Sequence, residues 1–81
     1  MKLVEFTEFL VKSLVQDPDL VSVKQFDDED DIVNIQVLVD QEEMGRVVGR
    51  GGKNIHAVRV LVQAASSMGD NKRVRINVDS F

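Results

Sequence analysis

The sequence predicts an α+β fold in the order helix, strand, strand, helix, helix, strand. Residues 32–39 alternate apolar and polar side chains, as in a half-buried strand. Residues 2–16 and 52–68 instead repeat apolar side chains at helical spacing. The chain has 81 residues, of which 43% are hydrophobic, and this is enough for one small core. We therefore expect a three-stranded mixed sheet with helices packed on one face.

The N-terminal region is predicted to form a helix and the first two strands. The helix over residues 2–16 has an apolar stripe made of Leu3, Phe6, Leu10 and Leu14. Residues 17–19 read Asp-Pro-Asp and end this helix, because proline disfavours helix at the residue before it. A strand over 20–26 and an acidic connector over 27–31 lead into the strand at 32–39, so these two strands should pair as a hairpin.

The C-terminal region is predicted to contain two helices and the last strand. Asp40 is a good N-cap for a short helix that runs to about Val48. A glycine-rich stretch interrupts it, and a longer helix covers 52–68 until Gly-Asp-Asn at 69–71 signals a turn. A strand follows at 74–78. Because helices connect it to the strand at 32–39, the two strands should be parallel with a right-handed crossover. We expect one domain over residues 1–81, with a core at 32–78 and an extension at 2–27.

The charges are strongly polarised along the chain. Residues 1–43 carry three Lys or Arg and twelve Asp or Glu, whereas residues 44–81 carry seven and two. No acid occurs from 44 to 69, although the net charge of the whole chain is −4. Salt screens charges beyond about 8 Å, so a local positive patch acts locally despite the overall negative charge. The second half is therefore able to attract an anion.

Composition excludes several classes of site. The chain has no cysteine, which rules out disulfides, thiolate metal sites and cysteine nucleophiles. No signal peptide and no apolar run of membrane length are visible, so we expect a cytoplasmic protein. The single histidine, His56, has no second histidine or cysteine beside it and is expected on a solvated helix face near Arg59 and Gln63.

The glycine-rich stretch at 45–55 is the most informative motif. It contains four glycines, three cations and no carboxylate. Glycine lets a ligand approach the backbone closely, and a helix that begins there offers free N–H groups. The cations Arg46, Arg50 and Lys53 favour phosphate as that ligand. The alternative is that the loop serves only as a turn between two helices.

Residues 49–52 fit the pattern glycine, any, any, glycine, between two predicted helices. With Val47-Val48 before it and Lys53-x-Ile55 after it, this loop resembles that of the KH family of single-stranded nucleic-acid-binding domains. The element order resembles the type II, bacterial arrangement, in which a helix and a strand precede the core. The segment from Asp40 to Leu61 resembles the small stand-alone bacterial KH proteins of the KhpA type.

The resemblance implies that the loop clamps the sugar-phosphate backbone of about four nucleotides. It implies an aliphatic groove for the bases and no cofactor, no metal and no catalysis. The implied RNA-binding residues are Arg46, Val47, Val48, Gly49, Arg50, Gly51, Gly52, Lys53 and Ile55. It further implies an RNA chaperone or post-transcriptional regulator of low sequence specificity. Similar bacterial proteins pair with a larger KH-containing partner of the Jag or KhpB type and influence cell elongation and division.

Other motifs fit less well. A phosphate-binding P-loop needs glycine where Val47 stands and Ser or Thr where Asn54 stands, and the dinucleotide fingerprint also fails at Asn54. The acidic run at 27–31 lacks the spaced ligands and the glycine of a calcium loop. An enzyme that handles phosphate is a remote alternative. The main alternative is a protein-interaction adaptor that uses the KH scaffold for homo- or heterodimers and touches no RNA.

The helix over 52–68 is too apolar for one buried face. Its apolar residues span about 220° of the helical wheel, whereas a surface helix needs little more than about 100°. Ile55, Val58, Val62 and Ala65 are expected to face the sheet. The apolar residues left over are Ala57, Val60, Leu61, Ala64 and Met68. They predict either a symmetric helix-to-helix dimer centred on Leu61, with the small side chains allowing close approach, or cover from the N-terminal helix.

Overall fold

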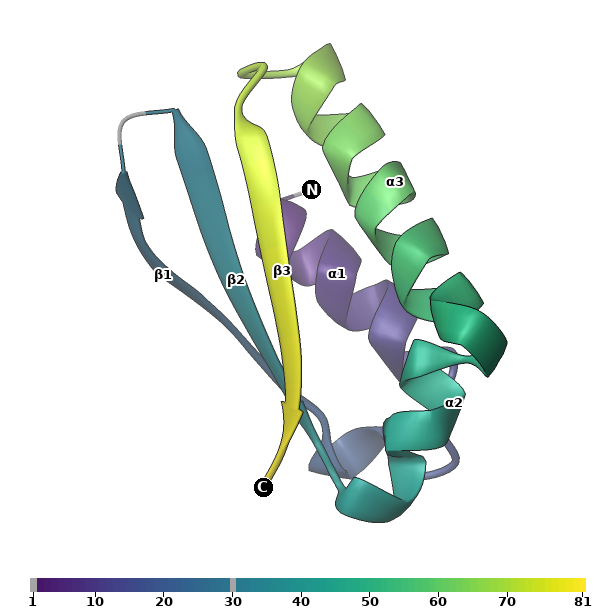
Figure 1. The fold of residues 1–81 in the computed structure, drawn as a ribbon. Coiled ribbons are helices and arrows are strands. Elements are labelled where there is room, and N and C mark those ends of the chain that lie inside the picture. The colour runs from purple at the N-terminus through teal and green to yellow at the C-terminus, as the bar shows by residue number, and fades with distance from the viewer. Residues whose placement is uncertain (1, 30) are drawn as a thin grey trace.

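The structure is a computed structural model that describes residues 2–29 and 31–81. A sheet forms one layer and the helices pack on one face of it (Figure 1). The helices are α1 (Leu3–Lys12), α2 (Met44–Val48) and α3 (Lys53–Met68), and the strands are β1 (Ser22–Glu29), β2 (Ile32–Val39) and β3 (Arg73–Ser80). Short 3-10 turns are η1 (Pro18–Leu20), η2 (Gln41–Glu43) and η3 (Arg50–Gly52). The predicted fold class and element order are confirmed.

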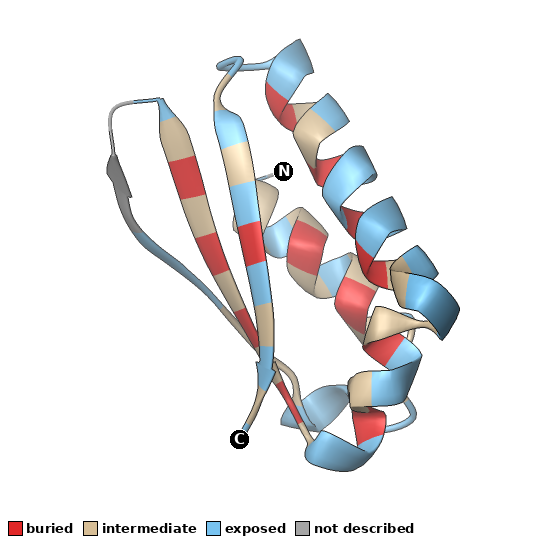
Figure 2. Ribbon diagram, in the orientation of Figure 1, coloured by how far each residue is buried: buried red, intermediate tan, exposed pale blue. Residues whose placement is uncertain are grey.

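The sheet places β2 in the centre, in the order β1-β2-β3. β1 and β2 pair antiparallel, whereas β2 and β3 pair parallel with Ile35 opposite Ile76. The predicted hairpin and parallel crossover are therefore confirmed. Every second residue of β2 is buried against the helices, as the red bands in Figure 2 show. These residues are Val33, Ile35, Val37 and Val39.

The first helix ends earlier than the prediction of residue 16, because α1 stops at Lys12. A carboxylate oxygen of Glu43 accepts bonds from the backbone N–H groups of Gln16, at 2.8 Å, and Asp17, at 2.9 Å. Those donors are consequently turned away from the helical carbonyls. Leu14 and Val15 still pack against the core, so the apolar pattern is correct although the helix itself is not continuous.

Two strands are longer than predicted. β1 begins at Ser22 and extends to Glu29, so much of the expected acidic connector at 27–31 belongs to the strand, and residue 30 lies outside the described residues. β3 extends over Arg73–Ser80 rather than 74–78. In both cases backbone pairing with β2 continues past the apolar residues, because the hydrogen-bond ladder does not require apolar side chains.

The inner face of α3 is close to the prediction. Ile55, Val58 and Val62 are buried, and Ala65 is half-buried. Ser66 is also buried and was not expected there. Its hydroxyl donates to the carbonyl of Lys72 at 2.6 Å and accepts from the Lys72 N–H at 3.1 Å, which holds the turn between α3 and β3.

Candidate nucleic-acid interface

The glycine loop connects α2 to α3 on the helical side of the molecule, away from the sheet (Figure 1). Gly49, Gly51 and Gly52 have φ of 77°, 64° and 78°. Side chains disfavour this left-handed region, whereas glycine enters it at little cost. The sequence motif thus corresponds to a backbone path that glycine makes accessible.

Gly49 is also required for space. A Cβ on this residue would lie 2.7 Å from Cγ and 2.8 Å from the backbone nitrogen of Asn54. The Asn54 side chain occupies this place because its Nδ2 donates to the Arg46 carbonyl at 2.7 Å. Asn54 therefore ties the first turn of α3 to the end of α2. Sequence reasoning used Asn54 only to exclude other motifs and missed this role.

The short turn η3 sets the backbone donors of the loop. The Gly52 N–H donates to the Gly49 carbonyl at 3.1 Å, and the Lys53 N–H donates to the Arg50 carbonyl. The N–H groups of Arg50 and Gly51 come first in the turn, and the first donors of a helical turn have no acceptor within it. Two donors thus remain beside the most exposed part of the loop.

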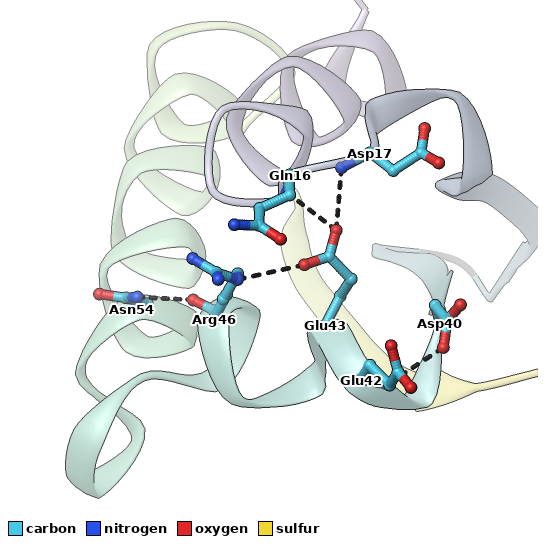
Figure 3. A network of polar contacts seen from close by, with 7 residues as sticks. All are labelled: Gln16, Asp17, Asp40, Glu42, Glu43, Arg46 and Asn54. Atoms are coloured by element: carbon cyan, nitrogen blue, oxygen red, sulfur yellow. Dashed lines mark hydrogen bonds and ion pairs between the residues drawn. The ribbon is translucent and has the colours of Figure 1, made fainter.

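The three cations are all exposed, but they differ in whether they have an acidic partner. Arg50 and Lys53 are exposed, and so is Gly51 between them. Arg46 is paired instead, because its Nε lies 3.2 Å from Oε1 of the buried Glu43. Figure 3 shows Glu43 between this guanidinium and the backbone of Gln16 and Asp17. The sequence predicts a short helix after Asp40 but does not identify Glu43 as a buried residue.

The apolar residues beside the loop are not a solvent-facing floor. Val47 is 0% exposed and Ile55 is 6% exposed, so both belong to the core, while Val48 is half-buried. Direct contact between a base and the first two side chains is incompatible with this burial. The expectation of an aliphatic floor is corrected accordingly: these two residues support the loop from beneath, and Val48 is the member of the three with substantial exposed surface.

A groove of about 540 Å³ lies between α3 and β3. Its lining includes His56, Arg59, Val60, Gln63 and Ser67 of α3 and Val74 of β3. The Gln63 amide donates to the Lys72 carbonyl at 3.0 Å and accepts from the Val74 N–H at 2.9 Å. His56 is exposed beside Arg59 and Gln63, as predicted. Sequence reasoning missed the groove itself, because it depends on how the helix lies against the edge strand.

The remaining apolar face of α3 is open to solvent. Ala57, Val60, Leu61, Ala64 and Met68 are all exposed, with Leu61 at 48% and Met68 at 90%. α1 packs against α3 without covering these residues. The predicted alternative, in which the N-terminal helix covers this face, is therefore wrong. The helix lies against the other side of α3, where the buried residues are.

Two further features are absent from the part of the chain that the structure describes. No helix in this part of the chain is long and apolar enough to cross a membrane. Among the same residues, no group of three or more His, Cys, Asp or Glu side chains is placed to hold a metal ion.

The fold is similar to part of larger solved structures. It aligns with a point variant of Aquifex aeolicus Era bound to GDP.AlF4- with a TM-score of 0.70 and 14% identity. It aligns with Era in complex with MgGDPNP and nucleotides 1506–1542 of 16S ribosomal RNA with a TM-score of 0.71 and 14% identity. In both cases 96% of this chain is covered but only 29% of the other chain, so the likeness concerns the fold of that portion.

Sequence comparison is more specific. The RNA-binding protein KhpA of Thermotoga maritima is 34% identical over 74 residues, which cover 91% of this chain and 95% of that protein. The protein of the same name from Streptococcus pneumoniae serotype 4 is 34% identical and covers 86% of this chain and 85% of its own length. The family model described as KhpA/KhpB, KH domain matches residues 4–78. The chain therefore belongs to the KhpA/KhpB family of KH domains.

Proposed function

We propose that this chain binds single-stranded RNA and that the loop Gly49–Gly52 holds the sugar-phosphate backbone. The observation that carries the proposal is the loop itself. Arg50, Gly51 and Lys53 are exposed together, next to backbone donors, in a segment without acids. Cations and backbone N–H groups are the donors that phosphates meet in nucleic-acid complexes. The names of the relatives from Thermotoga and Streptococcus, which describe RNA-binding proteins, support the same ligand.

The residues divide into three roles in this proposal. Arg50 and Lys53 pair with phosphates, and Gly51 lets the strand approach the main chain. Gly49 and Gly52 set the path of the loop. Arg46 contributes less, because Glu43 already neutralises part of its charge. Val48 offers apolar contact, while Val47 and Ile55 act from the core.

Affinity for a single domain should be modest and sensitive to salt. The loop and its neighbours contain no aromatic side chain on which bases stack, and stacking is worth about 1–3 kcal/mol per base in other single-strand binders. With two free cations, the logarithm of the binding constant should fall with the logarithm of salt with a slope of about −0.7 per neutralised phosphate.

The decisive experiment reverses the charge of the loop and uses a neutral pair of the same shape to control for the strain of a side chain at Gly51, whose φ is 64°. Arg50→Asp combined with Gly51→Asp should reduce RNA affinity by at least about 30-fold, because each lost charge-assisted bond is worth roughly 1.5–3 kcal/mol. Arg50→Asn combined with Gly51→Asn is the matched control, since asparagine has the same shape and carries no charge. Fluorescence anisotropy with a short RNA at two salt concentrations measures both. Equal affinity of the Asp and Asn pairs would contradict a phosphate clamp.

A second candidate function is protein interaction, which the exposed apolar face of α3 favours. Val60, Leu61 and Met68 leave a contiguous helical stripe in solvent, with the small Ala57 and Ala64 beside it. We propose that this stripe forms a homodimer or pairs with a larger KH-containing protein of the KhpB type. Wild-type protein that dimerises but binds no RNA at low salt would favour the adaptor over the RNA-binding function.

The biological role is a further part of the proposal. Family resemblance suggests an RNA chaperone or post-transcriptional regulator in the bacterial cytoplasm, linked to cell elongation and division. Replacement of the chromosomal gene by the Asp-pair variant should reproduce any change in cell length seen on deletion, whereas the Asn pair should retain more of the wild-type length. A deletion strain with normal cell length would remove this part of the proposal and leave RNA binding untouched.

A further inference from the structure

The edge strand β3 holds one arginine of α3 in a fixed position. β3 pairs only with β2 among the described strands, so its outer edge presents backbone groups that lack a strand partner. The Ile76 carbonyl on this edge accepts from Arg59 Nε at 3.3 Å and from Nη2 at 3.0 Å. A carbonyl oxygen has two lone pairs, so both are used. The Ile76 carbonyl is then closed to other donors.

The same contacts leave the far end of the guanidinium available. A guanidinium carries hydrogens on all three nitrogens and has no acceptor. Arg59 Nη1 makes no hydrogen bond within residues 2–29 and 31–81, and Nη2 has a second hydrogen beyond the one that reaches Ile76. These terminal nitrogens form a planar fork, which suits two adjacent acceptors. Arg59 is exposed, so the fork is accessible from the groove.

The neighbouring amide of the groove does not compete for the same acceptors. Gln63 uses its Nε2 on the Lys72 carbonyl and its Oε1 on the Val74 N–H. Both ends of its amide are thus engaged with β3. The fork of Arg59 therefore stays available to a ligand in this groove, beside the exposed ring of His56.

The groove lies along α3, beginning at His56 shortly after the glycine loop. Arg59 follows Gly52 by seven residues, which is two helical turns and a rise of roughly 10 Å. An RNA strand whose phosphates are held at Arg50 and Lys53 can reach this part of the groove with a neighbouring base. Because the segment from 44 to 69 contains no acid, the whole path is free of negative side chains on α3.

We propose that Arg59 makes this groove favour guanine over adenine at one nucleotide of the bound RNA, an inference that rests on the proposed RNA-binding function. Guanine presents O6 and N7 as adjacent acceptors, the pair that arginine contacts most often in specific recognition. Adenine presents an amine donor beside N7, which opposes a donor-only fork, and uracil has a single acceptor on the corresponding edge. Cytosine offers N3 and O2 as adjacent acceptors on its Watson–Crick edge, which single-stranded RNA exposes, so the fork separates guanine from adenine and not from cytosine. The domain is then expected to have low sequence specificity at most positions of the RNA and a base preference at one nucleotide.

The first test uses wild-type protein and base analogues. Oligouridine of about eight nucleotides, the site-size range of single-strand binders, carries one guanine, adenine, cytosine or 7-deazaguanine at successive positions. At one position guanine should bind about tenfold tighter than adenine, within the range for a bidentate arginine contact. The 7-deazaguanine, which lacks the N7 acceptor, should lose most of this advantage. Equal binding of guanine and adenine at every position overturns the guanine site.

The second test uses variants and reads the ratio of affinities for guanine and adenine. Arg59→Met keeps the aliphatic stem and should bring the ratio close to one. Arg59→Lys keeps the charge without the fork and should also lower it. Arg75→Met removes an exposed cation from β3 and should retain the wild-type ratio. A wild-type ratio in Arg59→Met overturns the inference; if that variant fails to fold, Arg59→Lys and the analogue series decide.

The two proposals fail in different ways. Arg50→Asp combined with Gly51→Asp tests the clamp and should weaken binding to all oligonucleotides. The Arg59 variants test base choice and should change the ratio of affinities for guanine and adenine. RNA binding with no base preference overturns the guanine site alone. A wild-type protein that binds none of the oligonucleotides overturns the clamp and the guanine site together.

Discussion

The glycine loop and the apolar face of α3 differ in how far each is completed within the chain. The loop is held by internal bonds: Asn54 reaches the Arg46 carbonyl, and Glu43 joins the segment after α1 to Arg46. The apolar face has no such partner among the described residues, and Leu61 remains 48% exposed. One region is thus organised before any ligand arrives, whereas the other exposes surface that an apolar partner would cover.

This difference separates two kinds of interaction. A preorganised loop loses little conformational entropy when it binds, so its few polar contacts suffice for a modest affinity. An exposed apolar stripe gains mainly from burial, at about 25 cal/mol per Å² of apolar surface removed from water. Substitutions in the loop region should therefore change the fold and RNA binding, whereas substitutions on the stripe should change assembly.

The largest effect is expected on assembly. Leu61→Lys places two charges at the centre of the proposed symmetric contact, one from each copy, and should weaken the dimer by at least about 100-fold because unpaired buried charges are strongly unfavourable. Light scattering and analytical ultracentrifugation measure the mass. Asn77→Lys, on β3 and next to the buried Ile76, is the control and should keep the wild-type mass. A wild type with the mass of one chain would end the dimer proposal.

The next largest effect is expected on the fold of the loop. Gly49→Ala forces a Cβ to within 2.8 Å of the Asn54 backbone nitrogen at a φ of 77°, so it should lower the free energy of unfolding. The expected loss is about 3 kcal/mol. Urea denaturation measures it. Gly45→Ala, where a Cβ meets nothing within 4 Å, should instead be neutral or stabilise by up to about 1 kcal/mol. Similar stabilities for the two variants would argue against the described loop path.

A smaller loss is expected when the buried carboxylate is removed. Glu43→Ala leaves the N–H groups of Gln16 and Asp17 without their acceptor and frees Arg46. The free energy of unfolding should fall by about 2 kcal/mol. The exposed neighbour Glu42 is the control. Glu42→Ala should lower the free energy of unfolding by only a few tenths of the loss expected for Glu43→Ala. If both substitutions have the same effect, Glu43 does not anchor the segment that follows α1.

The smallest effect is expected at Asn54. Asn54→Ala removes the bond to the Arg46 carbonyl and should cost about 1 kcal/mol of stability. RNA affinity should fall by a few-fold as well, because the loop is then less well fixed. Thermal unfolding and RNA anisotropy measure the two effects. Asn54→Asp keeps the shape but has no donor, and it should behave like alanine or worse; wild-type behaviour in that variant would show that the donor has no role.

The element order, the hairpin and the parallel crossover were correctly predicted from the sequence. They follow from local patterns that the tertiary structure does not override, such as the alternation in residues 32–39 and the helical spacing in 52–68. The boundaries were less accurate where long-range contacts decide them. α1 ends at Lys12, and Glu43, distant in sequence, takes the backbone donors of Gln16 and Asp17 that a helix continuing to residue 16 would use.

The candidate site was predicted in part. The pattern of glycines and cations located the loop. It did not distinguish Arg50 and Lys53, which have no acidic partner among the described residues, from Arg46, which is paired. It also placed Val47 and Ile55 at a surface although they are core residues. Side chains next to a motif face either inward or outward, and only the packing of both helices on the sheet decides which.

By itself the sequence determined the fold class, the family and the place of the loop, because periodicity and glycine chemistry act over a few neighbouring residues. Only the tertiary structure decided that Arg59 meets Ile76, that Asn54 closes the space at Gly49, and that the apolar face of α3 stays open. Each of these depends on two segments that are separate in the chain. The way α2 and α3 pack on the sheet brings these segments together. Patterns within a few neighbouring residues do not specify such long-range contacts.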